Sequence, residues 1–271
     1  MIGAVIGDIV GSRFEHAPIK NKQFKLFTKE SAFTDDTVMT LGTLEAIVKN
    51  KPYDICYRQW GKDYPNRGYG GSFREWLGNP KMKAYNSFGN GSAMRVSPIG
   101  FLYNTEDIVL HEAKKSAECT HNHPEGIKGA QAVALAIFMA RTKKSKEEIQ
   151  KRIEDLFGYN FDVPTEKFKR TYQFDVSCQG SVPQAIQCFL EANSYEETIR
   201  RAVALGGDSD TLAAIAGSIA DAYYGEISEY MMRMSFRILP DRIWHLLMYY
   251  GTKYHVMSII NYRASTNRKM L

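Results

Sequence analysis

Apolar residues in this chain recur three and four positions apart, which is the spacing that places side chains on one face of an α-helix. In residues 34–49, for example, Val38, Leu41 and Leu44 share such a face behind a Thr and Asp cap cluster. The spacing predicts helices at residues 34–49, 126–141, 145–157, 182–192, 195–205, 208–224 and 240–251. Convincing strand-like alternation is nearly absent and no strand-helix-strand order recurs, so the chain is predicted to be all-α.

The chain has 271 residues, of which 44% are hydrophobic and 24% charged. These values are typical of a globular protein that buries a large core without a disulfide or a structural metal, and we expect a single domain over residues 1–271. The cysteines lie far apart in the sequence, with no histidine at ligand spacing, so neither a disulfide framework nor a zinc site is expected. They are Cys56, Cys119, Cys178 and Cys188.

The sequence also indicates the cellular compartment of the protein and its classes of partner. The apolar start at residues 1–10 is interrupted by Asp8 and lacks a basic leader, so it does not resemble a signal peptide. The longest apolar run, residues 132–140, is too short for a bilayer, which takes about 20 residues. We therefore expect a cytoplasmic protein with reduced thiols and no membrane partner. The formal charge of +5 comes from dispersed Lys and Arg residues, so nucleic acid is not expected as a primary partner.

Two short acidic segments, TDDT at residues 34–37 and DSDT at residues 208–211, each fall at the start of an expected helix. Asp, Ser and Thr side chains commonly cap helix starts, which would explain one residue of each segment. A second carboxylate adds repulsion that a nearby cation would offset. Carboxylate and hydroxyl oxygens are the ligands that Mg²⁺, Mn²⁺ and Ca²⁺ prefer, so the two segments could face each other across two ions. The spacing alone leaves capping and metal binding both open.

Three further elements carry weaker signals. Glu15 follows a glycine-punctuated segment and would ordinarily be a surface residue. Residues 86–95 combine small residues with Phe88, which suits either a phosphate cradle with a stacking ring or a plain turn. In residues 120–124, His121 and His123 flank an asparagine, and hydrogen-bonded structural roles are expected there rather than metal ligation. Residues 64–100 contain seven of the 21 glycines, and long glycine-rich loops are usually functional or mobile.

In this order, the segments resemble the ADP-ribosylglycohydrolase family, which includes dinitrogenase reductase-activating glycohydrolases and ADP-ribosylarginine hydrolases. The resemblance spans residues 3–225 and leaves the last 46 residues uncovered. The matching stretches are GAVIGDIVGSRFE at 3–15, FTDDTVMTLGTLEAI at 33–47, GNGSAMRVSPIG at 89–100, THNHPEGIKGAQAVALAIFMAR at 120–141 and ALGGDSDTLAAIAGSIADAYYG at 204–225.

The resemblance implies a compact, orthogonal all-α bundle that binds two Mg²⁺ or Mn²⁺ ions and cleaves ADP-ribose from a modified acceptor. It assigns one ion to Thr34, Asp35 and Asp36, and the other to Asp208 and Thr211, with Asp210 bridging them. Asp35 and Asp210 are therefore expected to be essential for catalysis. Glu15 matches an acidic residue beside the metals that could position or deprotonate a water molecule.

The resemblance also implies a binding side for the nucleotide, with Phe88 stacking on adenine and His121 lining the same cleft. The residues expected to hold diphosphate and ribose are Ser87, Phe88, Gly89, Asn90 and Gly91. The expected reaction is attack of water at the ribose anomeric carbon of an ADP-ribosyl-arginine protein by a monomeric enzyme. Residues 64–83 or the C-terminal 46 residues are expected to select the acceptor.

Three alternatives remain open at this stage. One is a binuclear hydrolase of another ADP-ribosyl linkage, including a small-molecule ADP-ribosyl substrate, or of a nucleotide N-glycoside. Another is an ADP-ribose-binding module without turnover, and the third is a helical scaffold in which every acidic segment is a cap.

Overall fold

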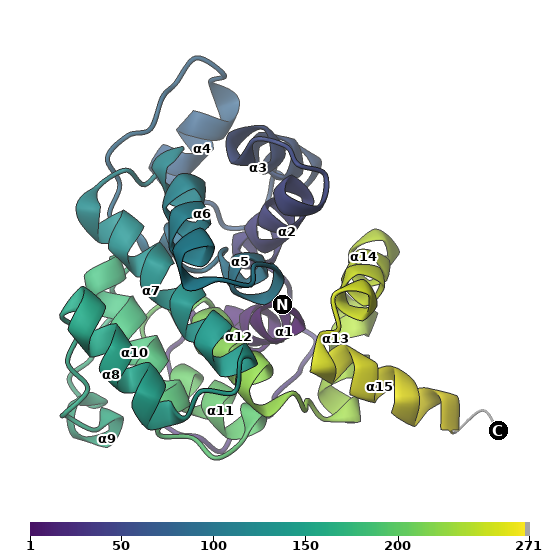
Figure 1. The fold of residues 1–271 in the computed structure, drawn as a ribbon. Helices are drawn as coiled ribbons and strands as arrows, with labels where there is room; N and C mark the ends of the chain where they lie inside the picture. Colours follow the sequence, from purple (N-terminus) through teal and green to yellow (C-terminus); the bar gives the residue numbers. More distant parts are fainter. Residues whose placement is uncertain (269–271) are drawn as a thin grey trace.

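The computed structural model describes residues 1–268 and confirms an all-α protein (Figure 1). Within that range it contains fifteen α-helices, two short 3-10 helices and one isolated antiparallel bridge between Gly89 and Ser177, but no strand. The α-helices are α1 Ile2–Gly11, α2 Asp35–Val48, α3 Tyr53–Asp63, α4 Gly71–Gly78, α5 Ser97–Leu102, α6 Glu106–Glu118, α7 Pro124–Arg141, α8 Lys146–Phe157, α9 Thr165–Phe168, α10 Cys178–Leu190, α11 Tyr195–Leu205, α12 Ser209–Tyr224, α13 Glu229–Ile238, α14 Asp241–Lys253 and α15 Met257–Arg268. The 3-10 helices are η1 Ser12–Phe14 and η2 Asn90–Ser92.

Helices α1 and α12 form the centre of the molecule (Figure 1). Every residue of α1 is buried, as is every residue of α12 from Ser209 to Ala222. Helices α7, α10 and α11 pack around α12, and α2 packs beside α1. A helix that is apolar on every side except for one acid, Asp8, belongs in a core.

Glycines at every fourth position allow α1 and α12 to approach unusually closely. Gly3, Gly7 and Gly11 share one face of α1, and a Cβ on any of them would overlap backbone atoms of α12. The overlapping backbone carbonyls would be those of Gly217, Ala213 and Ser209, respectively. This contact fixes the C-terminal end of α1 against the N-terminal end of α12, where the second acidic segment lies.

Most of the expected helices are confirmed within one or two residues. The clearest difference is α10, which begins at Cys178 rather than at residue 182. The Ser177 hydroxyl accepts a hydrogen bond from the Gly180 backbone N–H, which caps an earlier start and leaves Pro183 inside the helix. Residues 64–100 are not one long loop, because they contain α4, η2 and the first turn of α5.

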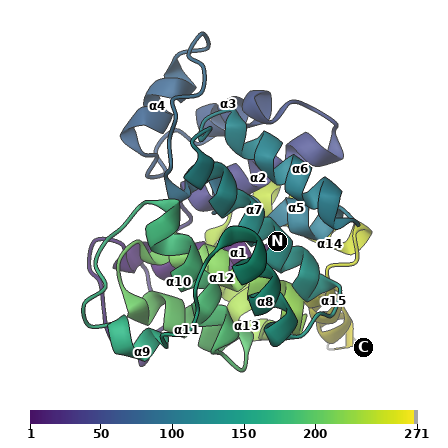
Figure 2. The same ribbon diagram turned by 60° about the vertical axis from the view of Figure 1, so that its left-hand side comes forward.

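The remaining helices lie towards the periphery. Figure 2 shows α4 and its flanking segments at the outer edge of the molecule, and α14 and α15 end the described chain on the opposite side. No described helix is long and apolar enough to cross a bilayer. All four cysteines are free, as expected. The last three residues of the predicted domain and of the C-terminal 46 lie outside the described range.

Candidate active site

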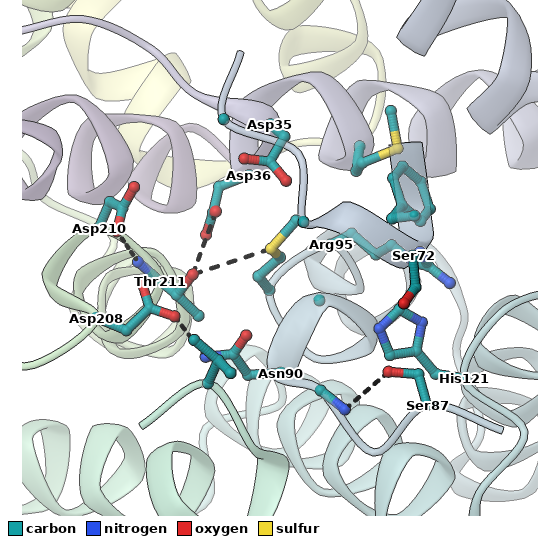
Figure 3. A pocket seen from close by; sticks show the side chains of 18 of the residues that line it. Asp35, Asp36, Ser72, Ser87, Asn90, Arg95, His121, Asp208, Asp210 and Thr211 are labelled. Carbon is teal, nitrogen blue, oxygen red and sulfur yellow. Dashed lines mark hydrogen bonds between the residues drawn. The ribbon is translucent and has the colours of Figure 1, made fainter. Parts of the chain in front are cut away.

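A cavity of about 350 Å³ lies where the ends of α1, α2 and α12 meet the segment that leads into η2. Most of the residues singled out in the sequence line it (Figure 3). They are Glu15, Asp35, Asp36, Ser87, Gly89, Asn90, Gly91, His121, Asp208, Asp210 and Thr211. Thr34 and Phe88 are the two members of the predicted set that do not line this cavity.

The acidic side of the cavity brings the two helix-start segments into contact. Carboxylate oxygens of Glu15, Asp208 and Asp210 all lie within 4.8 Å of one another. The Thr211 hydroxyl donates to Asp36 Oδ2 at 3.2 Å, which joins α12 to α2 (Figure 3). Glu15 is therefore not the free surface residue that its sequence context alone suggested.

Burial and mutual repulsion oppose ionisation of these carboxyl groups. Burial raises the pKa of Asp35 to about 8, and the charges of Asp8 and Asp208 add to the shift. The pKa values of Asp36 and Asp210 are raised well above the ordinary carboxyl value, also by burial first and by neighbouring carboxylates second. The pKa of Glu15 is raised by burial and by the charge of Asp208. A bound cation would favour the ionised form of every one of these groups.

The donor set fits a hard metal ion better than it fits helix capping. Asp36 Oδ1 is buried, with no hydrogen-bond partner among residues 1–268. The Asp208 side chain makes no capping bond to α12, although it occupies the N-cap position. Only Thr34 behaves as a cap, since its hydroxyl accepts from the Asp36 N–H at 3.3 Å. Capping therefore explains one residue of the two segments, and all-oxygen ligation suits the others.

Asp8 is an important residue that the sequence analysis did not identify. It is the single acid of α1, is fully buried, and accepts hydrogen bonds from both the backbone N–H and the hydroxyl of Thr34 and of Thr37. Burial raises its pKa to about 6, and these hydrogen bonds act in the opposite direction. Asp8 thereby anchors the start of α2 to α1. The available signal was its position as a lone acid in an otherwise apolar helix.

The opposite side of the cavity is built by the loop of residues 87–91. This loop is held against the start of α10, because Asn90 N donates to Val176 O at 2.7 Å and Cys178 N donates to Phe88 O at 2.8 Å. The Gly89 N–H bonds to Ser87 Oγ at 3.1 Å. Two backbone N–H groups of the expected phosphate cradle are thus already occupied. Asn90 also reaches across the cavity, since its side-chain amide donates to Asp208 Oδ2 at 2.8 Å.

Phe88 and His121 occupy different positions on this side. The Phe88 ring is 49% exposed and stands edge-on to His123, with 5.4 Å between ring centroids. His121 is buried and lines the cavity, and its Nδ1 lies 2.7 Å from the Thr120 hydroxyl. Burial, together with the charge of Arg95, lowers the pKa of His121 well below its ordinary value. His121 is therefore neutral at physiological pH.

Several cavity residues had no role assigned from the sequence. Arg95 lies in residues 89–100, one of the stretches that resemble the family, and Ser72 lies in the stretch expected to select the acceptor. The apolar part of the lining consists of Met39, Phe73, Tyr85, Met94 and Val176. Their positions depend on tertiary packing, and no local pattern distinguishes them.

The comparisons with known proteins agree with this architecture. A family model described as ADP-ribosylglycohydrolase matches residues 1–234. The chain is 29% identical to ADP-ribosylhydrolase ARH3 of Mus musculus, over 83% of this chain and 82% of that protein. It is 25% identical to ADP-ribosylarginine hydrolase Tri1 of Pseudomonas putida, over 83% of this chain and 69% of that protein.

A solved structure titled "ADP-ribosylglycohydrolase-related protein complex" has the same fold, with a TM-score of 0.66 and 23% identity over 97% of this chain and 95% of that chain. The family model covers residues 1–234, and this range includes both acidic segments that line the cavity. The chain belongs to the ADP-ribosylglycohydrolase family of hydrolases.

Proposed function

We propose that this protein removes ADP-ribose from a modified acceptor by metal-dependent attack of water at the ribose anomeric carbon. The observation that carries the proposal is the meeting of Glu15, Asp36, Asp208 and Asp210 in one cavity whose opposite wall is a neutral, glycine-rich loop. A cation-binding wall facing a polar, uncharged wall suits a sugar bound at one end and its nucleotide part at the other.

The acidic wall would hold two Mg²⁺ or Mn²⁺ ions. Asp35 and Asp36 would provide ligands for one ion, Asp208 and Thr211 for the other, and Asp210 for both. Thr34, expected as a further ligand of the first ion, does not line the cavity, and its hydroxyl already donates to Asp8 and caps α2, so only its remaining lone pair is available to a metal. Such ions orient ribose hydroxyls and lower the pKa of a bound water. Asp8 contributes indirectly, because it fixes the backbone and hydroxyl of Thr34.

Glu15 is the residue we expect to orient or deprotonate the attacking water. It is half-buried beside Asp208 and Asp210, and its raised pKa suits proton transfer. Glu15→Gln should retain metal and ADP-ribose binding while lowering the hydrolysis rate by roughly 10² to 10⁴, the usual contribution of a general acid or base. Single-turnover kinetics and calorimetry on the same preparation would test this. Wild-type turnover would make Glu15 structural, and a large loss of metal affinity would make it a ligand instead.

The glycine-rich wall would hold the ADP part of the substrate. Ser87, Gly89, Asn90 and Gly91 line the cavity, and the exposed ring of Phe88, which lies between two of these lining residues in the sequence, is available to an adenine base. His121 lies against the same wall, with its Nε2 beside Gly89 and Gly91.

For the acceptor we propose a protein arginine, with a hydroxyl-linked acceptor as the second candidate. A second cavity of about 470 Å³ adjoins the first at Glu15, and its lining includes His16, Lys20 and Tyr172. Glu15 is the one carboxylate among its lining residues, whereas Lys20 contributes positive charge. The arginine acceptor is supported by the similarity to the ADP-ribosylarginine hydrolase Tri1. The balanced charge of this second cavity is what makes a neutral, hydroxyl-linked acceptor the second candidate. Gly68 and residues 70–73 of the expected acceptor-selecting stretch line the first cavity instead.

The test is release of free ADP-ribose from two proteins, one modified on arginine and one on serine, under identical conditions. Release from the arginine-linked protein alone would support the first acceptor, and release from the serine-linked protein alone would support the second. ADP-ribose binding without release from either would contradict hydrolysis and favour a binding module.

A further inference from the structure

Three residues form a continuous chain of hydrogen bonds behind the glycine-rich wall. Arg95 Nη2 lies 2.9 Å from Thr120 Oγ1, and that same oxygen lies 2.7 Å from His121 Nδ1. All three side chains are nearly inaccessible, with exposures of 1%, 0% and 5%, respectively. Arg95 is itself held in place, because Nη2 also donates to Ser116 O at 2.8 Å and its guanidinium stacks 4.1 Å above the Tyr57 ring.

The directions of these hydrogen bonds follow from counting protons. A guanidinium can only donate, so Thr120 Oγ1 accepts from Arg95. Two acceptors lie within reach of the Thr120 hydroxyl proton, His121 Nδ1 and the Cys119 thiol, and sulfur is much the weaker acceptor of the two. If Nδ1 carried a proton pointing at the hydroxyl, that buried hydroxyl proton would have only the weak sulfur acceptor, which costs free energy. The favoured arrangement therefore has Thr120 donating to a bare Nδ1.

A neutral imidazole with a bare Nδ1 carries its proton on Nε2. Nε2 points at the loop of residues 87–91, the glycine-rich wall that we also call the ligand wall. A Cβ built on Gly91 or Gly89 would lie 3.2 or 3.5 Å from Nε2, respectively. No described side chain or carbonyl accepts from Nε2, although His121 is nearly buried. The Nε2–H group is thus a hydrogen-bond donor without a partner among the described residues. Figure 3 shows the His121 ring among the side chains that line the cavity.

We propose that Thr120, oriented by Arg95, is a positioning residue that fixes His121 as the Nε2–H tautomer, so that His121 donates a hydrogen bond to the bound ADP-ribosyl group. In this role His121 cannot act as a proton acceptor at Nε2, which leaves water activation to the acidic wall. The inference rests on the proposed function for the identity of the ligand, while the tautomer itself follows from the protein alone.

The tautomer can be measured directly by NMR on protein labelled with ¹⁵N in its histidine side chains. Ring ¹⁵N shifts and their couplings distinguish a protonated nitrogen from a bare one, and the signals of His121 are assigned by their absence in His121→Gln. We expect a protonated Nε2 and a bare Nδ1 in the wild type. Thr120→Val should give a mixture of tautomers, and Thr120→Ser should restore the wild-type spectrum because it keeps the hydroxyl.

Calorimetry with ADP-ribose, in the presence of Mg²⁺, provides the functional readout. Thr120→Val should weaken ADP-ribose binding about threefold to tenfold, in the range of one hydrogen bond, and Thr120→Ser should bind like the wild type. A protonated Nδ1 in the wild type would overturn the proposal, even if Thr120→Val failed to fold. Unchanged tautomer and affinity in a folded Thr120→Val protein would also overturn it. The wild type could also fail to bind ADP-ribose although Nε2 is protonated. That result would overturn the proposed function and the donor role of His121, and it would support the assigned tautomer.

Discussion

The two walls of the cavity are built in different ways. The acidic wall consists of helix ends, with the start of α2 tied to α1 through Asp8 and the start of α12 pressed against α1 by glycine contacts. The ligand wall consists of irregular segments, and it is held by hydrogen bonds from residues 87–91 to the start of α10 and by the Arg95, Thr120 and His121 chain. The acidic wall therefore depends on helix packing, and the ligand wall depends on individual hydrogen bonds.

This difference predicts that the two walls can be damaged separately. Changes at the acidic wall should remove metal binding and hydrolysis together. Changes at the ligand wall should weaken ADP-ribose binding and leave metal affinity intact.

The largest effect is expected from Asp210→Ala. Asp210 is buried between Asp208 and Asp36, so its loss removes the oxygens proposed to serve both ions. Hydrolysis should fall by about a thousandfold or more, since metal stabilisation of charge contributes several kcal/mol. Metal titration by calorimetry should show weakened binding. Asp107→Ala, an exposed acid on α6, is the matched control and should change neither property. Wild-type turnover with metal retained in Asp210→Ala would remove Asp210 from the site.

A smaller effect is expected when the packing beneath the acidic wall is disturbed. In Gly7→Ala the added methyl would overlap the Ala213 carbonyl, so α1 and α12 must separate. Overpacking of this kind costs about 1 to 3 kcal/mol in free energy of unfolding, and metal affinity should fall with it. Denaturant unfolding gives the first quantity and calorimetry the second. Gly78→Ala is the control, because a Cβ there meets nothing within 4 Å and Gly78 does not line the cavity. Equal stability of the two variants would show that the helices do not need this close contact.

The smallest effect is expected from Phe88→Ala on the ligand wall. Stacking of a base on an aromatic ring contributes about 1 to 3 kcal/mol, and the half-exposed ring of Phe88 should fall in the lower part of that range. The dissociation constant for ADP-ribose should rise accordingly, while metal affinity stays unchanged. Tyr249→Ala removes a somewhat more exposed ring on α14 and serves as the control. Unchanged ADP-ribose affinity in Phe88→Ala would exclude the ring from the binding site.

The same difference between the walls explains how much the sequence revealed. The acidic segments stand at helix starts, where local patterns carry information, and α2 and α12 begin within one residue of the expected positions. Asp8 was missed because its hydrogen-bond partners lie at the start of α2, and nothing in the sequence of the buried helix α1 indicates them. Thr120 and Arg95 were missed because a hydrogen bond between residues 25 positions apart depends on how the end of α6 packs against Arg95.

For the ligand wall, composition alone predicted more groups free to bind a ligand than the structure has. Small residues at 87–91 suggested free backbone N–H groups, yet those of Gly89 and Asn90 are bonded within the protein. Phe88 was expected to stack on adenine, and its exposed ring does not line the cavity but stands edge-on to His123. Both details depend on the contact with residues 176–178, which no local pattern predicts.

The account depends most directly on the metal requirement of hydrolysis. The decisive measurement is release of ADP-ribose from ADP-ribosylated protein by enzyme stripped with EDTA, before and after addition of Mg²⁺ or Mn²⁺, with Asp210→Ala treated in parallel. We predict no release from the stripped enzyme, recovery on addition of either metal, and no recovery in Asp210→Ala. Full-rate release by the stripped wild-type enzyme would contradict the central claim that the acidic wall acts through bound metal.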